Sequence, residues 1–127
     1  MTTEGVLGRF DLGAEIDRFP PGVPSGRRSE TLLKTPRLRV VLVTMRAGTE
    51  LREHTAPGVI TVQPLQGRFA FMTDGGEREI AAGTLIALEA NTRHAVRAIE
   101  DGAFLLTIAW PDDARDAAIP SHESGET

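Results

Sequence analysis

The sequence predicts an all-β protein, a small antiparallel barrel or sandwich with one short helix near the start of the chain. One observation supports this class. From residue 29 onward the chain breaks into eight short apolar or alternating runs, each closed by Gly, Asn, Asp or Pro, with no helical pattern between them. Runs of this kind at regular spacing are typical of antiparallel sandwiches and barrels. A length of 127 residues suffices for one domain with one core.

The helix is expected over residues 10–19. Leu12, Ile16 and Phe19 recur at helical spacing, and Asp11 stands where an N-cap is needed. A Pro-Pro pair ends this pattern, and the Pro-, Gly- and Ser-rich stretch after it is expected to be a loop whose arginines lie in solvent.

The strand candidates follow in order. They cover residues 29–35, 38–48, 59–67, 68–76, 77–83, 84–91, 94–102 and 103–111. A hairpin turn is expected at Asp74-Gly75-Gly76, because Asp favours the start of a turn and glycine tolerates positive φ. We therefore divide the chain into a helix and loop (1–28), a β-barrel (29–111) and an acidic tail (112–127) that is expected to be disordered.

Alternation along two strands predicts which side chains face inward. In residues 94–99 the charged Arg97 lies opposite His94 and Val96, so His94 is expected to face the interior. In residues 59–66 neither face is purely apolar, and the face that carries Thr61 and Gln63 is expected to line a pocket. Pro64 cannot donate a ladder hydrogen bond, so this strand should be an edge or contain a bulge.

Composition and charge exclude several classes of function. The chain is 40% hydrophobic and 25% charged, with no apolar run near the roughly 20 residues of a membrane helix and no signal-peptide pattern. We therefore expect a cytoplasmic protein without a membrane partner. It has no cysteine, which excludes disulfides and thiolate metal ligands. The formal net charge of −4 arises in the tail, and without a basic stripe no nucleic-acid partner is expected.

Two glycine-flanked corners resemble the paired motifs of the cupin superfamily, also called RmlC-like proteins. The first corner is GTELREHTAPGVITVQPLQG at residues 48–67, and the second is GTLIALEANTRHAV at residues 83–96. The anchors that match the family spacing are Gly48, His54, Gly67, Gly83 and His94. The resemblance covers about residues 38–110 and implies a double-stranded β-helix, or jelly-roll barrel.

The same comparison implies an incomplete metal site. Ala56 stands where cupins usually carry a second histidine, and Val59 or Ile60 stands where they carry a glutamate. Only His54 and His94 remain of the four usual ligands. Because stable divalent sites normally use three or four protein ligands, a transition metal such as Fe, Mn, Ni or Zn is expected to bind weakly, if at all.

Seven residues are candidates for a pocket in the barrel. They are His54, His94, Arg52, Thr61, Gln63, Phe69 and Phe71. The two histidines could bind a metal, contact an organic ligand, or simply satisfy each other or nearby backbone groups. Phe69 and Phe71 could equally be core. Glu53 and Glu89, which lie near the histidines in sequence, are expected to be solvated.

Two functions remain open at this point. The first is a non-enzymatic cupin that binds a small molecule in its barrel. The alternative is a metal-dependent cupin enzyme of the dioxygenase, isomerase or decarboxylase type, using His54, His94 and one unconventional ligand. The last strand candidate, residues 103–111, is apolar on both faces, so we expect it to be covered either by a second copy in a homodimer or by the N-terminal helix.

Overall fold

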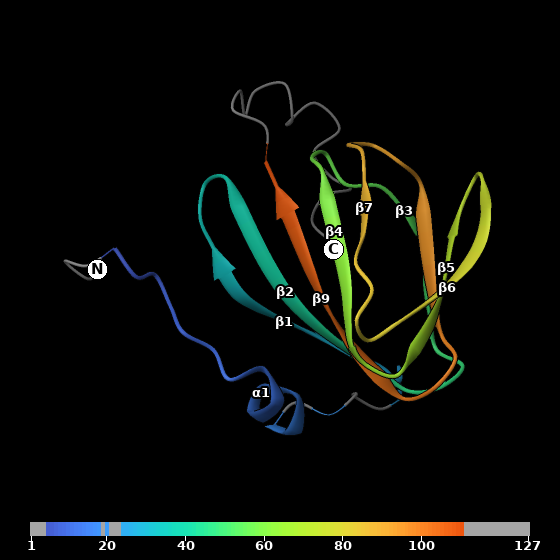
Figure 1. The fold of residues 1–127 in the computed structure, drawn as a ribbon, viewed down its shortest axis with the longest axis horizontal. Coiled ribbons are helices and arrows are strands. Elements are labelled where there is room, and N and C mark those ends of the chain that lie inside the picture. Colours follow the sequence, from blue (N-terminus) through green and yellow to red (C-terminus); the bar gives the residue numbers. More distant parts are fainter. Residues whose placement is uncertain (1–4, 19, 21–23, 111–127) are drawn as a thin grey trace.

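The computed structural model describes residues 5–18, 20 and 24–110. This part of the chain forms one short helix and nine strands in two antiparallel sheets (Figure 1). The helix α1 spans Leu12–Arg18. The strands are β1 (Arg27–Lys34), β2 (Leu38–Met45), β3 (Glu50–His54), β4 (Ile60–Gln66), β5 (Arg68–Thr73), β6 (Gly76–Ala81), β7 (Ile86–Leu88), β8 (His94–Ala98) and β9 (Gly102–Ala109).

The chain passes repeatedly between the two sheets. One sheet has the order β1-β2-β9-β4-β7 and the other has the order β3-β8-β5-β6. Only β1 with β2 and β5 with β6 are neighbours both in sequence and in a sheet, and every other step from β2 to β9 changes sheet. This exchange produces the double-stranded β-helix that the sequence predicts. The two sheets face each other around a common interior (Figure 1).

The strand that sequence reasoning missed is β3. Its sequence, ELREH, holds one apolar residue, Leu51, so neither an apolar run nor a clean alternation marks it. Pairing with β8 is what makes it a strand. At the start of the barrel, β1 begins at Arg27 rather than at residue 29, and the acidic tail lies outside the described residues.

The core lies between the sheets and is built from aliphatic and phenylalanine side chains. Phe69 and Phe104 meet edge to face from opposite sheets, with ring centroids 5.2 Å apart. Other core members come from β2, β4, β8 and β9, including Val43, Val62, Val96 and Leu106. Apolar residues at alternate positions of these strands turn inward because burial removes them from water.

The prediction for β8 is confirmed. His94, Val96 and Ala98 are buried, whereas Ala95 and Arg97 lie on the partly exposed side. His94 therefore begins a strand, β8, whose other inward-facing residues belong to the core.

The prediction for β4 is wrong in one respect. Ile60 and Val62 turn inward, and they pair with Ile108 and Leu106 of β9 in the core. Thr61 and Gln63 lie on the outer face of the sheet, and Gln63 is exposed. The face with Ile60 and Val62 turns to the interior because the inward side chains of the neighbouring strand β9 are apolar. A glutamine on that face would lose its hydrogen bonds to water.

Two local predictions concerning turns and bulges are confirmed. The ladder between β4 and β9 shifts register between Pro64 and Gln66, so Pro64 stands at an irregularity of the kind it requires. In the hairpin between β5 and β6, Thr73 pairs with Gly76, which has a φ of 122°, across the expected Asp-Gly turn. The Thr73 hydroxyl oxygen accepts a hydrogen bond from the Gly75 amide at 3.2 Å.

The helix begins as predicted. The Ala14 amide donates to the Asp11 carboxylate at 3.1 Å, which is an N-cap bond. No residue of α1 is buried, and Leu12 and Ile16 are only half-buried. The helix lies outside the barrel beside β1 (Figure 1), so β9 is not the strand beside it. Within the described residues, no helix has the length and apolar character needed to cross a membrane.

Candidate ligand-binding site

The two corner histidines meet inside the mouth of the barrel. His54 ends β3, His94 begins β8, and the antiparallel ladder sets them directly opposite each other. Their ring centroids are 4.3 Å apart with an angle of 60° between the rings. Forty residues separate them in sequence, so only the pairing of β3 with β8 brings the two imidazoles together.

A bulge in β3 determines which neighbours accompany His54. Leu51 pairs with Val96 and His54 pairs with His94, so β3 uses three steps where β8 uses two. Leu51 and His54 therefore face the same way, and Arg52 and Glu53 occupy the bulge, both exposed. Simple alternation would place Arg52 on the same face as His54, but the extra residue breaks the period of two.

Backbone hydrogen bonds fix the orientation of both rings. His54 Nδ1–H donates to the carbonyl oxygen of Arg52 at 2.7 Å, and His94 Nδ1–H donates to that of Thr92 at 3.0 Å. A carbonyl oxygen can only accept, so in each neutral ring the proton lies on Nδ1. Each Nε2 then keeps its lone pair, with which it can accept a hydrogen bond or bind a metal.

The environment of His94 favours its neutral form. Burial lowers its pKa below the ordinary value of 6.5, a nearby positive charge on His54 lowers it further, and the Thr92 carbonyl raises it. The Phe71 ring stacks on the imidazole at 5.7 Å with only 10° between the planes. His94 is 4% exposed, whereas His54 is only partly buried. The pair thus has an inner, neutral member and an outer member that solvent reaches.

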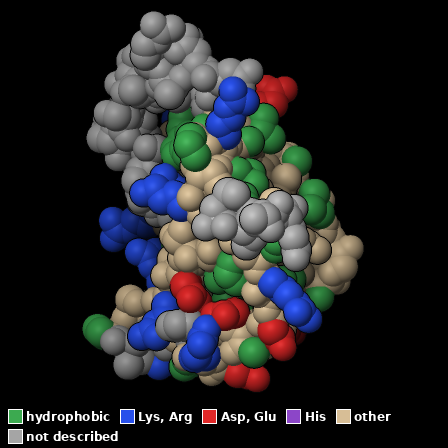
Figure 2. Space-filling model, turned by 90° about the vertical axis from the view of Figure 1, so that its left-hand side faces the viewer, with side chains coloured by type: hydrophobic (Ala, Val, Ile, Leu, Met, Phe, Trp, Pro, Cys, Tyr) green, Lys and Arg blue, Asp and Glu red, His purple; other side chains and the backbone are tan. Residues whose placement is uncertain are grey.

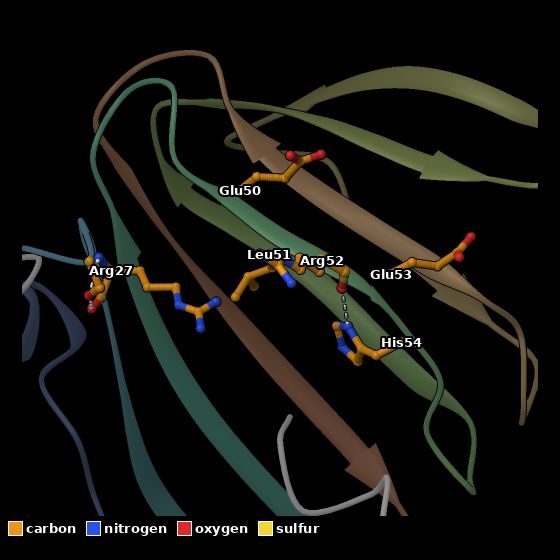
Figure 3. A pocket seen from close by; sticks show the side chains of 7 residues that line it. Arg27, Glu50, Leu51, Arg52, Glu53 and His54 are labelled. Carbon is orange, nitrogen blue, oxygen red and sulfur yellow. Dashed lines mark hydrogen bonds between the residues drawn. The ribbon is translucent and has the colours of Figure 1, made fainter.

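A cavity of about 490 Å³ opens beside the outer histidine. It lies between the first residues of β1 and strand β3 (Figure 3). Its lining comprises Ser25, Arg27, Glu50, Leu51, Arg52, Glu53 and His54. His94 stands behind His54 and does not line the cavity itself.

The seven predicted pocket residues divide into three groups. His54 and Arg52 line the cavity, and His94 contacts His54 from behind. Phe69 and Phe71 are fully buried in the core, although Phe71 supports His94. Thr61 and Gln63 face outward from the other sheet and are not part of this cavity.

Sequence reasoning placed Arg27 in a solvent-exposed loop; its side chain is exposed, but it also lines the cavity. It belongs to β1 rather than to a loop, and it pairs with Met45, whose side chain is fully buried. Residues paired across a ladder lie on the same face, so Arg27 is on the interior side of its sheet. The alternation of β2 directs Met45 inward, and pairing β1 with β2 would have predicted that Arg27 lies on the same inward face.

The charged side chains around the cavity are unevenly distributed. Arg27 extends toward Leu51, while the carboxylates of Glu50 and Glu53 are directed to the other side of β3 (Figure 3). Glu53 accepts an ion-pair hydrogen bond from Arg93 at 2.8 Å. The negative charge of Glu53 is thus engaged outside the cavity.

The residues present supply too few donors for an ordinary metal centre. The described part of the chain contains no group of three or more His, Cys, Asp or Glu residues that could hold an ion. Ala56, at the position of the second cupin histidine, is 3% exposed and brings only a methyl group. Two imidazole nitrogens fall short of the usual three or four protein ligands, so the described residues do not fit an ordinary transition-metal centre.

Solved structures give the remaining evidence on identity. An RmlC-like cupin from Desulfovibrio desulfuricans is 26% identical, with a TM-score of 0.62 over 86% of this chain and 96% of its own. A conserved protein of unknown function from Streptococcus pyogenes is 27% identical, with a TM-score of 0.65 over 70% of this chain and 78% of its own. An RmlC-like cupin from Shewanella frigidimarina, 17% identical, covers 75% of this chain and 86% of its own with a TM-score of 0.65.

No protein-family model matches the sequence, and no curated protein matches it. The fold and the site define a small double-stranded β-helix protein with one histidine from each corner at the barrel mouth. The structural neighbours are consistently cupins. The chain is a protein of the cupin superfamily.

Proposed function

We propose that this protein binds a small organic molecule at the mouth of its barrel without transforming it. One observation carries the proposal: a cavity of about 490 Å³ reaches His54, whose ring is oriented by the backbone and backed by neutral His94. This volume lies within the range of small-molecule sites. Leu51 offers an apolar surface there, and the imidazole offers a polar point that can fix the orientation of a ligand.

Binding is favoured over catalysis by the state of the acidic groups. A general acid or base needs a carboxylate or histidine within reach of the reacting atom and a suitable pKa. Glu50 and Glu53 are exposed and directed away from His54 (Figure 3), and Glu53 pairs with Arg93. The histidine pair is therefore better placed to accept hydrogen bonds from a ligand than to share a proton with a carboxylate.

Ligand retention tests this proposal. The purified protein is denatured and its extract is examined by mass spectrometry, in parallel with the variant His54→Ala/His94→Ala. We expect a small molecule that is retained by the wild type and lost from the double variant while the variant still unfolds cooperatively. Gln63→Ala is the matched control, because Gln63 lies on the outer face and should not affect retention.

Two results would count against binding at the mouth. A double variant that retains the same molecule as the wild type would place the ligand elsewhere. A double variant that is unfolded, with each single variant also unfolded, would make the pair a structural contact. In that case the histidines would have kept their cupin positions for packing alone.

A metal-dependent enzyme is the second candidate, favoured by the two Nε2 atoms that the backbone bonds leave unprotonated. Elemental analysis of untagged protein separates the two. A near-stoichiometric metal that is lost in His54→Ala/His94→Ala would support the enzyme and call for an unconventional third ligand. Protein that stays metal-free after incubation with iron, manganese, nickel and zinc would support organic-ligand binding.

A homodimer in the cytoplasm is part of the same proposal. The outer faces of β2, β9 and β4 carry Val40, Leu105 and Leu65, all only half-buried. Apolar side chains on adjacent strands are a surface that a second copy could cover. Light scattering coupled to size-exclusion chromatography should give twice the chain mass, and Leu105→Glu should shift it to one chain mass.

A further inference from the structure

We infer that the ligand of this site is a small organic anion whose carboxylate or phosphate group is held between Arg27 and Arg52. The inference rests on the proposed binding function and specifies the chemistry of the bound molecule. Both arginines line the same cavity, one from β1 and the other from the bulge of β3. The two sheets thus contribute one guanidinium each.

The register of β1 explains how Arg27 reaches the cavity. Its partner Met45 is fully buried, so Arg27 starts from the interior face of its sheet. Its side chain then extends across the opening toward Leu51 (Figure 3). Arg27 is exposed, but its place on the interior face directs it over the cavity, whereas Thr61 and Gln63 of β4 lie on the outer face of the sheet.

The two cavity arginines differ from nearby arginines in their partners. Arg93 pairs with Glu53 at 2.8 Å and Arg97 approaches Glu77 at 3.6 Å. Among the described residues, no ion pair engages Arg27 or Arg52. A guanidinium keeps its charge at any physiological pH, so both positive charges remain available to a ligand.

The acidic residues of the lining do not cancel this charge. Glu53 is already paired with Arg93. Glu50 is the remaining carboxylate of the lining, and it is directed to the side of β3 away from Arg27 (Figure 3). Two guanidinium groups against one averted carboxylate leave the cavity positive.

Lys and Arg side chains do not form a separate basic face on the surface that Figure 2 shows. In this view they occur together with Asp and Glu side chains, most closely toward the bottom. A continuous basic patch would indicate a polyanion such as a nucleic acid. Two arginines at a cavity of about 490 Å³ indicate a small anion instead.

Another lining residue, His54, limits the chemical class of the ligand further. The Nε2 atom of His54 can accept a hydrogen bond, because its Nδ1 donates to the Arg52 carbonyl. A ligand should therefore carry a hydroxyl or amine donor beside its anionic group. Guanidinium forks bind carboxylate and phosphate through paired hydrogen bonds. A hydroxy-carboxylate or a phosphate ester meets both requirements.

Titration with three probes, followed by NMR, tests the inference on the full chain. The probes are malate, its neutral diamide malamide, and inorganic phosphate. We expect malate or phosphate to shift the backbone amides of Arg27 and Arg52 and the ring resonances of His54, and malamide to bind at least about tenfold more weakly. High salt should weaken the binding of malate and phosphate and leave the binding of malamide unchanged.

The arginine variants provide the matched comparison. Arg27→Gln and Arg52→Gln should each weaken binding of the better anion about tenfold or more. Arg78→Gln is the control, because Arg78 lies on β6 and outside the cavity. A response to malate alone would indicate a carboxylate ligand, and a response to phosphate alone would indicate a phosphate ester.

The outcomes separate this inference from the proposed function. If the diamide binds as tightly as malate, or if both Gln variants bind like the wild type, the anion class is overturned while binding at the site stands. If none of the three probes shifts the cavity resonances, the anion class is also overturned. Failure of the proposed function is read separately, from a wild-type protein that yields no retained molecule dependent on the histidine pair.

Discussion

The inner and outer halves of the histidine site are built differently. His94 begins β8, whose inward face continues into Val96 and Ala98, and its ring stacks on fully buried Phe71. His54 ends β3, an edge strand whose bulge carries exposed residues. The inner half is therefore fixed by core packing, while the outer half depends on a few backbone hydrogen bonds and can respond to a ligand.

Removing Phe71, the ring that supports His94 in the inner half, should have the largest effect on stability. Phe71→Ala should lower the free energy of unfolding by about 3–5 kcal/mol, because a fully buried phenyl ring leaves a cavity in the core. Urea unfolding followed by tryptophan fluorescence measures this loss. Val59→Ala is the control, since Val59 is 50% exposed and its loss should change little. An equal loss in both variants would contradict the core role of Phe71.

Separate substitution of the two histidines should sharpen the contrast. His94→Ala should cost about 1–3 kcal/mol, because it empties a buried position between Phe71 and His54. His54→Ala should cost less than about 1 kcal/mol, because the ring it removes is partly exposed. Chemical denaturation of the two single variants gives the comparison. A larger cost at His54 would show that the outer half is the better packed one.

Acidification should act through the inner histidine. The folded state lowers the pKa of His94 below 6.5, so the unfolded chain takes up its proton more readily. Stability should therefore fall as the pH drops below 6.5, by at most about 1.4 kcal/mol per pH unit, and this contribution should be fully present above that pH. Denaturation midpoints across this window, compared with those of His94→Gln, measure the effect. A wild-type midpoint that rises on acidification would contradict the assignment.

The surface pair beside the outer half should have the smallest effect. Glu53→Gln breaks the contact with Arg93, but both side chains are more than half exposed, so solvent screens the interaction. We expect no measurable shift of the unfolding midpoint. Ligand affinity in the same variant is the more sensitive measurement, because freeing Arg93 adds positive charge near the cavity. A strong loss of stability would mean that this pair holds the bulge in place.

The sequence by itself determined the fold class and the inward direction of His94. Turn residues at regular spacing determined the strand count to within one, and the alternation of Val96 and Ala98 with Arg97 determined that His94 faces inward. These features depend on local conformational preference and on a period of two, which neighbouring residues express on their own.

The tertiary structure alone decided what surrounds the histidines. The inward face of β4 was settled by pairing with β9, which turned Gln63 outward. The bulge that exposes Arg52 exists only in the ladder with β8, and Arg27 reaches the cavity because β2 sets its register. Each of these depends on contacts between residues distant in sequence, whose free energy outweighs the weak preference of any short segment.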